Sequence, residues 1–461
     1  MSGPVSVHGL KAAPAATWRR GAVRARSCLI IVGAAALLAG CAGASLPKLN
    51  DLNPFKEVQQ PLPGKRVPVV QAVDRMGGAE LAAADKPIVI PPAVANEDWA
   101  QPGGAPSNAP GHLALGAQLR QAWSADAGTG SGSMGRVSAA PIVYGGRVFT
   151  IDAASRVSAF SSGGTAAWRT PLSPAHEQDR EGYGGGLAAD GGRVYAATGF
   201  GIVTALDPQS GKKLWEKSLG VPLRASPTAA GERVYVLATD GRFFCLSGAD
   251  GSELWTYRGV PDATRIISNP SPAVDGDVVV VPYTNGDLVG LRASDGQPVW
   301  QDSLARLRVR SSLAAMSDAS RPALSGGVVF AIGHSGRMVA TRQSDGERVW
   351  SLEIPGIEGP VVAGDTVFVV DTGGQMMAIN KSDGRMSWTV RLPGPTTWAG
   401  PVLAGGNLWA VSSKGNLVGV DAATGRVVQQ LNVGQSVSVA PVVAQGRLYL
   451  MTDQARLVAF N

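Results

Sequence analysis

Seven of the eleven tryptophans of this chain recur at a nearly regular spacing. They lie 45, 47, 40, 45, 50 and 38 residues apart, and Val428 follows the last of them by 40 residues, at the eighth equivalent position. Each interval holds four short apolar runs separated by turns. A period of about 40–50 residues with four short strands per unit is typical of the blades of a β-propeller. The repeat positions are Trp123, Trp168, Trp215, Trp255, Trp300, Trp350 and Trp388.

The first strand of each unit begins with a similar short segment, such as "PIVYGG" or "PVVAGD". The 60 glycines and 31 prolines among 461 residues suit short strands joined by tight turns better than they suit helices. The sequence therefore predicts an all-β fold, an eight-bladed β-propeller of four-stranded blades over residues 119–461. The eight first-strand segments begin at Pro141, Gly186, Pro227, Pro272, Pro322, Pro360, Pro401 and Pro441.

The last unit supplies three strands, in "SVSVAPVVA", "RLYLM" and "RLVAFN". The segment "LRQAWSAD" around Trp123 is an outer strand that precedes the first full unit. Pairing of these two parts would remove two open sheet edges, which are sites of aggregation. We therefore expect this amino-terminal strand to complete the last blade and to close the ring.

The residues of the repeat have structural explanations. A large aromatic ring on each outer strand can pack between neighbouring blades while its N–H finds a partner. Asp-Gly pairs such as Asp250-Gly251 are typical of two-residue hairpin loops, which require positive φ angles. We therefore interpret the recurring Trp and Asp residues as packing and turn residues, and we expect no metal site among them.

The first forty residues have the pattern of an export signal. Four arginines between positions 19 and 26 precede the apolar run "CLIIVGAAALLAG", which is too short to span a bilayer. The following "LAGC" resembles the lipobox of bacterial lipoproteins. The resemblance implies a signal peptide over residues 1–40, cleavage between Gly40 and Cys41, and acylation of Cys41 by chains such as palmitate. Ala42 favours retention in the outer membrane.

The net charge of +6 does not indicate a nucleic-acid partner. Five basic residues and no acidic residue lie in the first forty positions, so the rest of the chain carries 6 − 5 = +1. Most of the excess of basic over acidic residues therefore lies in the export signal.

Residues 41–118 are rich in Pro, Ala and Gly, as in "QQPLPGKRVPVV" and "QPGGAPSNAPG". Proline cannot donate a ladder hydrogen bond, and such sequences are typical of extended linkers. We expect a largely disordered tether here, so that deletion of residues 50–110 would leave the melting temperature of the ring nearly unchanged.

The segment "TALDPQSGKKLW", residues 204–215, resembles the tryptophan-docking repeat of quinoprotein dehydrogenases, which carry pyrroloquinoline quinone. Those enzymes use an adjacent Cys-Cys disulfide, a calcium ion and an aspartate base. Here the three cysteines are Cys28, Cys41 and Cys245, and no two are adjacent. The four histidines lie in no zinc or nucleophile motif. We expect no catalytic residues, no metal and no cofactor.

A lipobox, a tether and eight docking repeats without the cysteine pair resemble the BamB family, lipoproteins of the outer-membrane β-barrel assembly machinery. The resemblance covers residues 120–461 and the lipobox. It implies a non-enzymatic scaffold that faces the periplasm, docks on the POTRA domains of BamA in the BAM complex, and aids folding and insertion of nascent outer-membrane β-barrel proteins. The alternatives are a lipid-anchored periplasmic quinoprotein dehydrogenase and a ligand-sensing propeller.

In that family the contact with BamA uses two loops, which correspond here to "PDATRIISNPSP" and "LRVRSSLAAMSDASRP". The resemblance assigns partner binding to Arg265, Ile266 and Ile267 in the first loop and to Arg310 and Asp318 in the second. The second loop lies in the longest interval, of 50 residues. Aliphatic side chains beside arginine are also typical of interface anchors.

Overall fold

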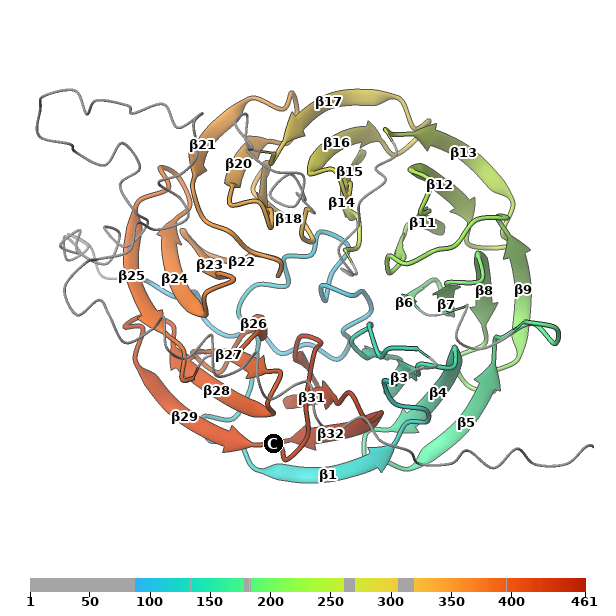
Figure 1. Cartoon of the computed structure of the whole chain (residues 1–461), viewed down its shortest axis with the longest axis horizontal. Coiled ribbons are helices and arrows are strands. Elements are labelled where there is room, and N and C mark those ends of the chain that lie inside the picture. The colour runs from blue at the N-terminus through green and yellow to red at the C-terminus, as the bar shows by residue number, and fades with distance from the viewer. Residues whose placement is uncertain are drawn as a thin grey trace, which may run out of the picture. The chain divides into compact units, whose positions relative to one another are not determined.

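The computed structural model describes residues 88–132, 135–177, 182, 184–260, 270–305, 319–394 and 396–461. In this part of the chain, eight four-stranded antiparallel sheets are arranged as blades around a common axis (Figure 1). The prediction of an all-β, eight-bladed propeller is confirmed. The described residues include no helix of the length and apolarity that a bilayer crossing requires. The predicted signal peptide, residues 1–40, lies outside the described residues.

Within each blade the strands follow one another from the axis to the rim. Blade one comprises β2 (Ile142–Tyr144), β3 (Arg147–Ile151), β4 (Arg156–Ser161) and β5 (Ala166–Pro171). Blade two comprises β6 (Gly185–Asp190), β7 (Arg193–Thr198), β8 (Ile202–Leu206) and β9 (Lys213–Ser218). Blade three comprises β10 (Thr228–Ala230), β11 (Arg233–Leu237), β12 (Arg242–Ser247) and β13 (Glu253–Arg258). Blade four comprises β14 (Ala273–Asp275), β15 (Val278–Pro282), β16 (Asp287–Arg292) and β17 (Pro298–Ser303). Blade five comprises β18 (Ala323–Ser325), β19 (Val328–Ile332), β20 (Met338–Arg342) and β21 (Arg348–Leu352). Blade six comprises β22 (Val361–Ala363), β23 (Thr366–Val370), β24 (Gln375–Asn380) and β25 (Met386–Arg391). Blade seven comprises β26 (Trp398–Ala404), β27 (Asn407–Ser412), β28 (Asn416–Asp421) and β29 (Val427–Asn432). Blade eight comprises β30 (Val442–Ala444), β31 (Arg447–Met451), β32 (Arg456–Phe460) and β1 (Gln121–Asp126).

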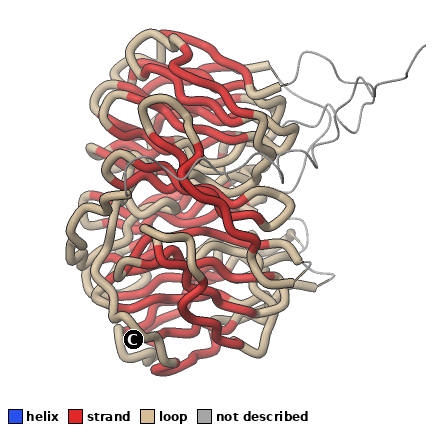
Figure 2. Tube along the Cα trace, turned by 90° about the vertical axis from the view of Figure 1, so that its left-hand side faces the viewer, coloured by secondary structure: helices blue, strands red, loops and turns tan. Residues whose placement is uncertain are grey.

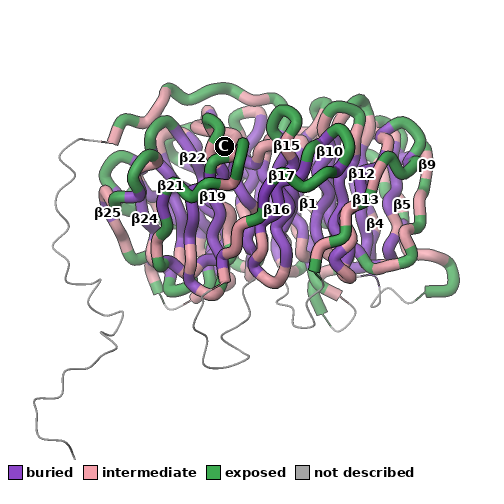
Figure 3. Tube along the Cα trace, turned by 90° about the horizontal axis from the view of Figure 1, so that it is seen from above, coloured by how far each residue is buried: buried purple, intermediate pink, exposed green. Residues whose placement is uncertain are grey.

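The middle strands form the core because each blade packs its two faces against its neighbours. In β23 all five residues are buried, and such two-sided burial favours continuous runs of β-branched and aromatic residues. The rim strands are more exposed and alternate between exposed and half-buried positions, as in β9. The strands run between the two faces of the ring, with turns at their ends (Figure 2). Buried residues fill the strand layer, and exposed residues concentrate in the loops (Figure 3).

Blade eight closes the ring with strands from opposite ends of the sequence. Strand β1 pairs antiparallel with β32, with Ser124 opposite Val458. Arg120 and Asn461 then exchange two backbone hydrogen bonds, of 2.9 and 3.0 Å. The predicted closure is confirmed, and two strand edges that would otherwise be open are paired.

Each repeat tryptophan joins its blade to the next one. In all seven, the indole Nε1–H donates to a backbone carbonyl of the following blade, at 2.7–3.1 Å. The indole also covers a glycine in the rim hairpin of that blade. At Gly211, φ is 71° and a Cβ would lie 2.5 Å from the ring of Trp168. The glycine of "TALDPQSGKKLW" is therefore required by the turn and by the neighbouring blade.

Blade seven has no tryptophan at the repeat position, where strand register places Gln429 and not Val428. Gln429 lies opposite Gly419, as Trp388 lies opposite Ala378 in blade six. The prediction of Val428 is wrong by one residue, since Gln429 follows the rim-hairpin glycine Gly425 by four residues, just as Trp388 follows Gly384. In blade eight, the outer strand is not joined to β32 by a hairpin that could receive an indole. Instead, the Gln429 amide exchanges two hydrogen bonds with the backbone of Leu119, of 3.0 and 2.9 Å.

We expect Gln429→Ala to lower the free energy of unfolding by about 1–3 kcal/mol, because it leaves the N–H and C=O of buried Leu119 without these partners. Chemical denaturation measures the change. The matched control is Gln430→Ala, since Gln430 is an exposed residue of the same strand. Equal stability of the two variants would show that the amide does not hold the closing strand.

Residues 88–118 pack against the ring, and we call them the belt. The predicted tether included them, and that part of the prediction is wrong. Trp99, Gln101, Asn108 and Leu113 of the belt are 5, 2, 5 and 3% exposed, respectively. The prolines and glycines are compatible with order because the belt takes its hydrogen bonds from the blades rather than from a ladder of its own. Residues 41–87 lie outside the described residues.

Candidate functional site

The belt follows the inner circumference of the ring and bonds to the innermost strands (Figure 1). In seven of the eight blades, the belt forms hydrogen bonds of 2.7–3.1 Å with the backbone of one residue of the innermost strand, and this residue is at the equivalent position in each blade. In blade six, Ile88 and Ile90 pack instead against the core shared with blade seven. The seven bonded residues are Val143, Ala189, Ala229, Val274, Leu324, Leu403 and Val443.

Two amide side chains of the belt bridge pairs of blades. The Gln101 Nε2 donates to the carbonyls of Ala189 and Ala229, both at 2.8 Å, and its Oε1 accepts from the Ala229 N–H at 2.9 Å. The Asn108 Nδ2 donates to the carbonyls of Pro272 and Pro322, at 3.3 and 3.0 Å. The first amide thus joins blades two and three, and the second joins blades four and five.

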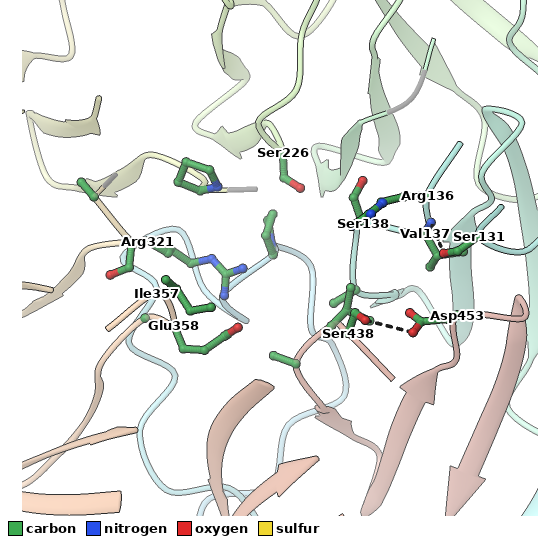
Figure 4. Close-up of a pocket in the computed structure, with 18 of the residues that line it drawn as sticks. Ser131, Arg136, Val137, Ser138, Ser226, Arg321, Ile357, Glu358, Ser438 and Asp453 are labelled. Carbon is green, nitrogen blue, oxygen red and sulfur yellow. Dashed lines mark hydrogen bonds between the residues drawn. The ribbon is translucent and has the colours of Figure 1, made fainter. Parts of the chain in front are cut away.

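A cavity of about 580 Å³ lies at the axis, beside the belt (Figure 4). Pro102 of the belt forms part of its wall. The remaining wall consists largely of the short segments that precede the innermost strands of six blades, such as residues 137–140 and 438–440. Since these segments converge on the axis from all sides, a side chain that is long at such a position must extend into the cavity.

One position in these segments is occupied by small residues in seven blades and by arginine in one. It precedes the first-strand proline, or the leucine that replaces it in blade two. Close packing requires small residues here, since a Cβ on Gly186 would lie 2.1 Å from the Ser226 hydroxyl. Blade five carries Arg321. The seven small residues are Ala140, Gly186, Ser226, Ser271, Gly359, Gly400 and Ala440.

Blade six adds a carboxylate next to this arginine. Glu358 stands one residue before Gly359, where the other blades carry no charged residue. The side chains of Arg321 and Glu358 both point into the cavity (Figure 4). Our sequence interpretation missed both residues. Alignment of the eight units at their first-strand segments would have found them, because each breaks a pattern of uncharged, mostly small residues.

The cavity holds two acidic and two basic side chains. Burial raises the pKa of Glu358 to about 7, and Arg321 and the Gly400 N–H, 3.4 Å from Oε2, only partly oppose this effect. Burial also lowers the pKa of Arg321, whose Nε is buried and has no hydrogen-bond partner. Arg136 and Asp453 complete the set, and the Asp453 carboxylate accepts from the Ser438 hydroxyl at 2.9 Å.

The predicted site residues lie outside the described residues. They are Gly40 and Cys41 at the lipobox and Arg265, Ile266, Ile267, Arg310 and Asp318 in the two candidate loops. The described residues that directly follow the loops are Pro270 and Ala319, which precede the innermost strands of adjacent blades and line the axial cavity.

Comparison with known proteins identifies a family. The family model described as "Outer membrane protein assembly factor BamB" matches residues 153–390 and 388–461. A curated relative, outer membrane protein assembly factor BamB of Burkholderia pseudomallei, is 28% identical over 186 residues, which cover 40% of this chain and 45% of the relative. The chain thus spans about half the length of the curated relatives it matches.

Solved structures show the same fold. BamB from Moraxella catarrhalis has a TM-score of 0.65 and 20% identity, over 75% of this chain and 100% of that chain. A europium-containing methanol dehydrogenase has a TM-score of 0.62 and 14% identity, over 77% of this chain and 89% of that chain. At these identities the likeness concerns the fold and carries no information on chemistry.

Within the described ranges, no three His, Cys, Asp or Glu side chains are grouped so that they could hold a metal ion. Cys245 is fully buried in β12, and burial raises the pKa of its thiol to about 12, so it is a core residue and not a reactive thiol. In the cavity, the Asp453 carboxylate accepts from the Ser438 hydroxyl, and Glu358 interacts electrostatically with Arg321.

Proposed function

This chain belongs to the family of outer membrane protein assembly factor BamB, and on that basis we propose that it is a non-enzymatic scaffold of the outer-membrane β-barrel assembly machinery. The observation that carries this proposal is the family match over most of the ring. The closed, eight-bladed fold is consistent with a scaffold, since closure gives a rigid body whose loops can present a fixed surface.

The proposed scaffold is attached to the outer membrane by acyl chains on Cys41 and faces the periplasm. Three acyl chains, at about 0.8 kcal/mol per buried methylene, would make this attachment effectively permanent. The proposed partners are the POTRA domains of BamA, the other members of the BAM complex, and nascent outer-membrane β-barrel proteins.

We place the BamA contact on the loops 261–269 and 306–318. Both loops lead into innermost strands, β14 and β18, and these strands belong to adjacent blades. The described residues that follow the two loops, Pro270 and Ala319, both line the axial cavity. The first loop contains Arg265, and the second contains Asp318 together with three arginines, Arg306, Arg308 and Arg310. Charged groups of this kind set the orientation and specificity of an interface.

We expect the wild-type chain to co-purify with the BAM complex from detergent-solubilised outer membrane, and the double variant Arg265→Glu plus Asp318→Arg to lose this association. Reversal of both charges places like charges opposite each other across the contact, which costs several kcal/mol. Immunoprecipitation followed by quantitation of BamA measures the effect.

The control makes the same charge changes away from the loops, in Arg385→Glu plus Glu253→Arg. Both residues are exposed on the ring, in blades six and three. This variant should co-purify as the wild type does. Unchanged co-purification of the loop variant would exclude these residues as the contact, and failure of the folded wild type to co-purify would contradict the proposed function itself.

A further inference from the structure

The axial cavity has properties that a scaffold role does not use. Its volume of about 580 Å³ lies within the range of small-ligand sites, about 300–1,000 Å³. Protein interiors are close-packed, and the axial positions are filled by small residues in the other blades. An arginine and a glutamate instead extend into the space that those small residues leave open.

We propose that the axial cavity binds a carboxylate group, with Arg321 as its main partner and Arg136 as a second cation. The inference goes beyond the proposed scaffold function and does not depend on it. The bound group would belong either to a free small carboxylate or to the carboxyl terminus of a peptide, and the recognising chemistry is the same in both cases.

The guanidinium of Arg321 carries the argument. Its Nε is buried, yet it has no hydrogen-bond partner among the described residues. Guanidinium groups bind carboxylates through two parallel N–H donors, and the two Nη groups can supply such a pair. Glu358 acts on Arg321 electrostatically and opposes the lowering of the arginine pKa by burial. Because Arg321 lines the cavity while its Nε is closed to solvent, a carboxylate that enters the cavity would bind at the Nη groups.

Glu358 makes binding dependent on pH. Its pKa of about 7 means that it gains a proton near neutral pH. A bound anion would raise this pKa further, because a nearby negative charge disfavours the ionised form. Binding is thus linked to proton uptake by Glu358, and affinity should increase as the pH falls. The other charged groups that face the cavity are Arg136, Arg321 and Asp453.

Isothermal titration of the purified chain tests the proposal with three probes. These are citrate, an octapeptide with a free carboxyl terminus, and the same octapeptide with an amidated terminus. We expect saturable binding of citrate or of the free-acid peptide, and none of the amidated peptide. Binding of citrate alone indicates a small carboxylate, and binding of the free-acid peptide indicates a chain terminus.

Variants identify the site. Arg321→Gln should weaken binding at least about tenfold, and Arg321→Lys should weaken it less, because lysine keeps the charge but loses the fork. Arg385→Gln is the matched control, because the Arg385 side chain is 88% exposed on blade six. Glu358→Gln should remove the difference in affinity between about pH 6 and about pH 8.

Three results would overturn the proposal. They are equal affinity of Arg321→Gln and the wild type, equal binding of the free and amidated peptides in the absence of citrate binding, and lack of saturable binding of all three probes. A melting temperature close to that of the wild type establishes that each variant is folded. Because no BAM component is present, these outcomes are independent of the co-purification experiment.

Discussion

Deletion of residues 119–126 should lower the melting temperature of the whole ring by roughly 10 °C or more. The deletion removes β1 and leaves the edge of β32 unpaired. It also removes Trp123, whose ring centroid lies 6.0 Å from that of Tyr449 and whose indole N–H donates to the Ser162 carbonyl. Trp123 is partly buried, so its loss alone should cost less than the about 3–5 kcal/mol that is typical of a fully buried tryptophan. Because β1 also carries the contact between blades eight and one, the effect should extend to the unfolding of the ring as one unit. Differential scanning calorimetry measures it.

Trp123→Ala is the graded variant and Ala122→Ser the matched control, since Ala122 is an exposed residue of the same strand. We expect an intermediate loss for the first and no change for the second. The deletion should also increase self-association, because an open strand edge is a template for pairing. A deleted chain that melts at the wild-type temperature as a monomer would contradict closure by β1.

The ring itself could be predicted from the sequence because its signals are local. A blade is built from neighbouring segments, so the spacing of the tryptophans and the first-strand prolines repeats with the blade. Even closure followed from local counting, since the last unit supplies three strands and the segment around Trp123 supplies one. The error at Val428 was avoidable on the same grounds. The rim-hairpin glycine lies four residues before the repeat residue, as Gly384 does before Trp388, and this spacing selects Gln429, as strand register does.

The belt could not be predicted because the contacts that hold it to the ring are not local. Its hydrogen bonds reach the innermost strands of seven blades, as far along the chain as Val443. A segment held in this way needs no periodic pattern of apolar residues and no regular series of N–H donors for sheet pairing. Its prolines and glycines therefore resemble those of a linker. Its buried Gln101 and Asn108 likewise resemble ordinary polar linker residues until the carbonyls that surround them are known.

The candidate cavity could be predicted from the sequence only in part. Its wall is assembled from distant segments, so the sequence alone does not show that they converge. Each segment nevertheless occupies the same place in its repeat, and Arg321 and Glu358 differ in charge and size from the residues at the matching places. In repeat proteins, a residue that departs from the repeat where packing demands small side chains is therefore a useful indicator of a site.

The double variant Gln101→Ala plus Asn108→Ala should lower the free energy of unfolding by roughly 5 kcal/mol. Gln101→Ala leaves three backbone groups without the amide, at roughly 3 kcal/mol, and Asn108→Ala leaves two carbonyls, at roughly 2 kcal/mol. The contributions should add, because the two amides bridge different pairs of blades and share no partner. Denaturation in guanidinium chloride measures the change.

Glu97→Ala is the control within the belt, since Glu97 is exposed, and it should leave stability unchanged. The comparison decides between two descriptions of residues 88–118. If they were a tether, both variants would match the wild type, and deletion of residues 50–110 would leave the melting temperature unchanged. If they hold the innermost strands together, the double variant loses stability without any change in the core of a blade. That deletion then destabilises the ring, because it removes both bridging amides and the Trp99 contact with blade one.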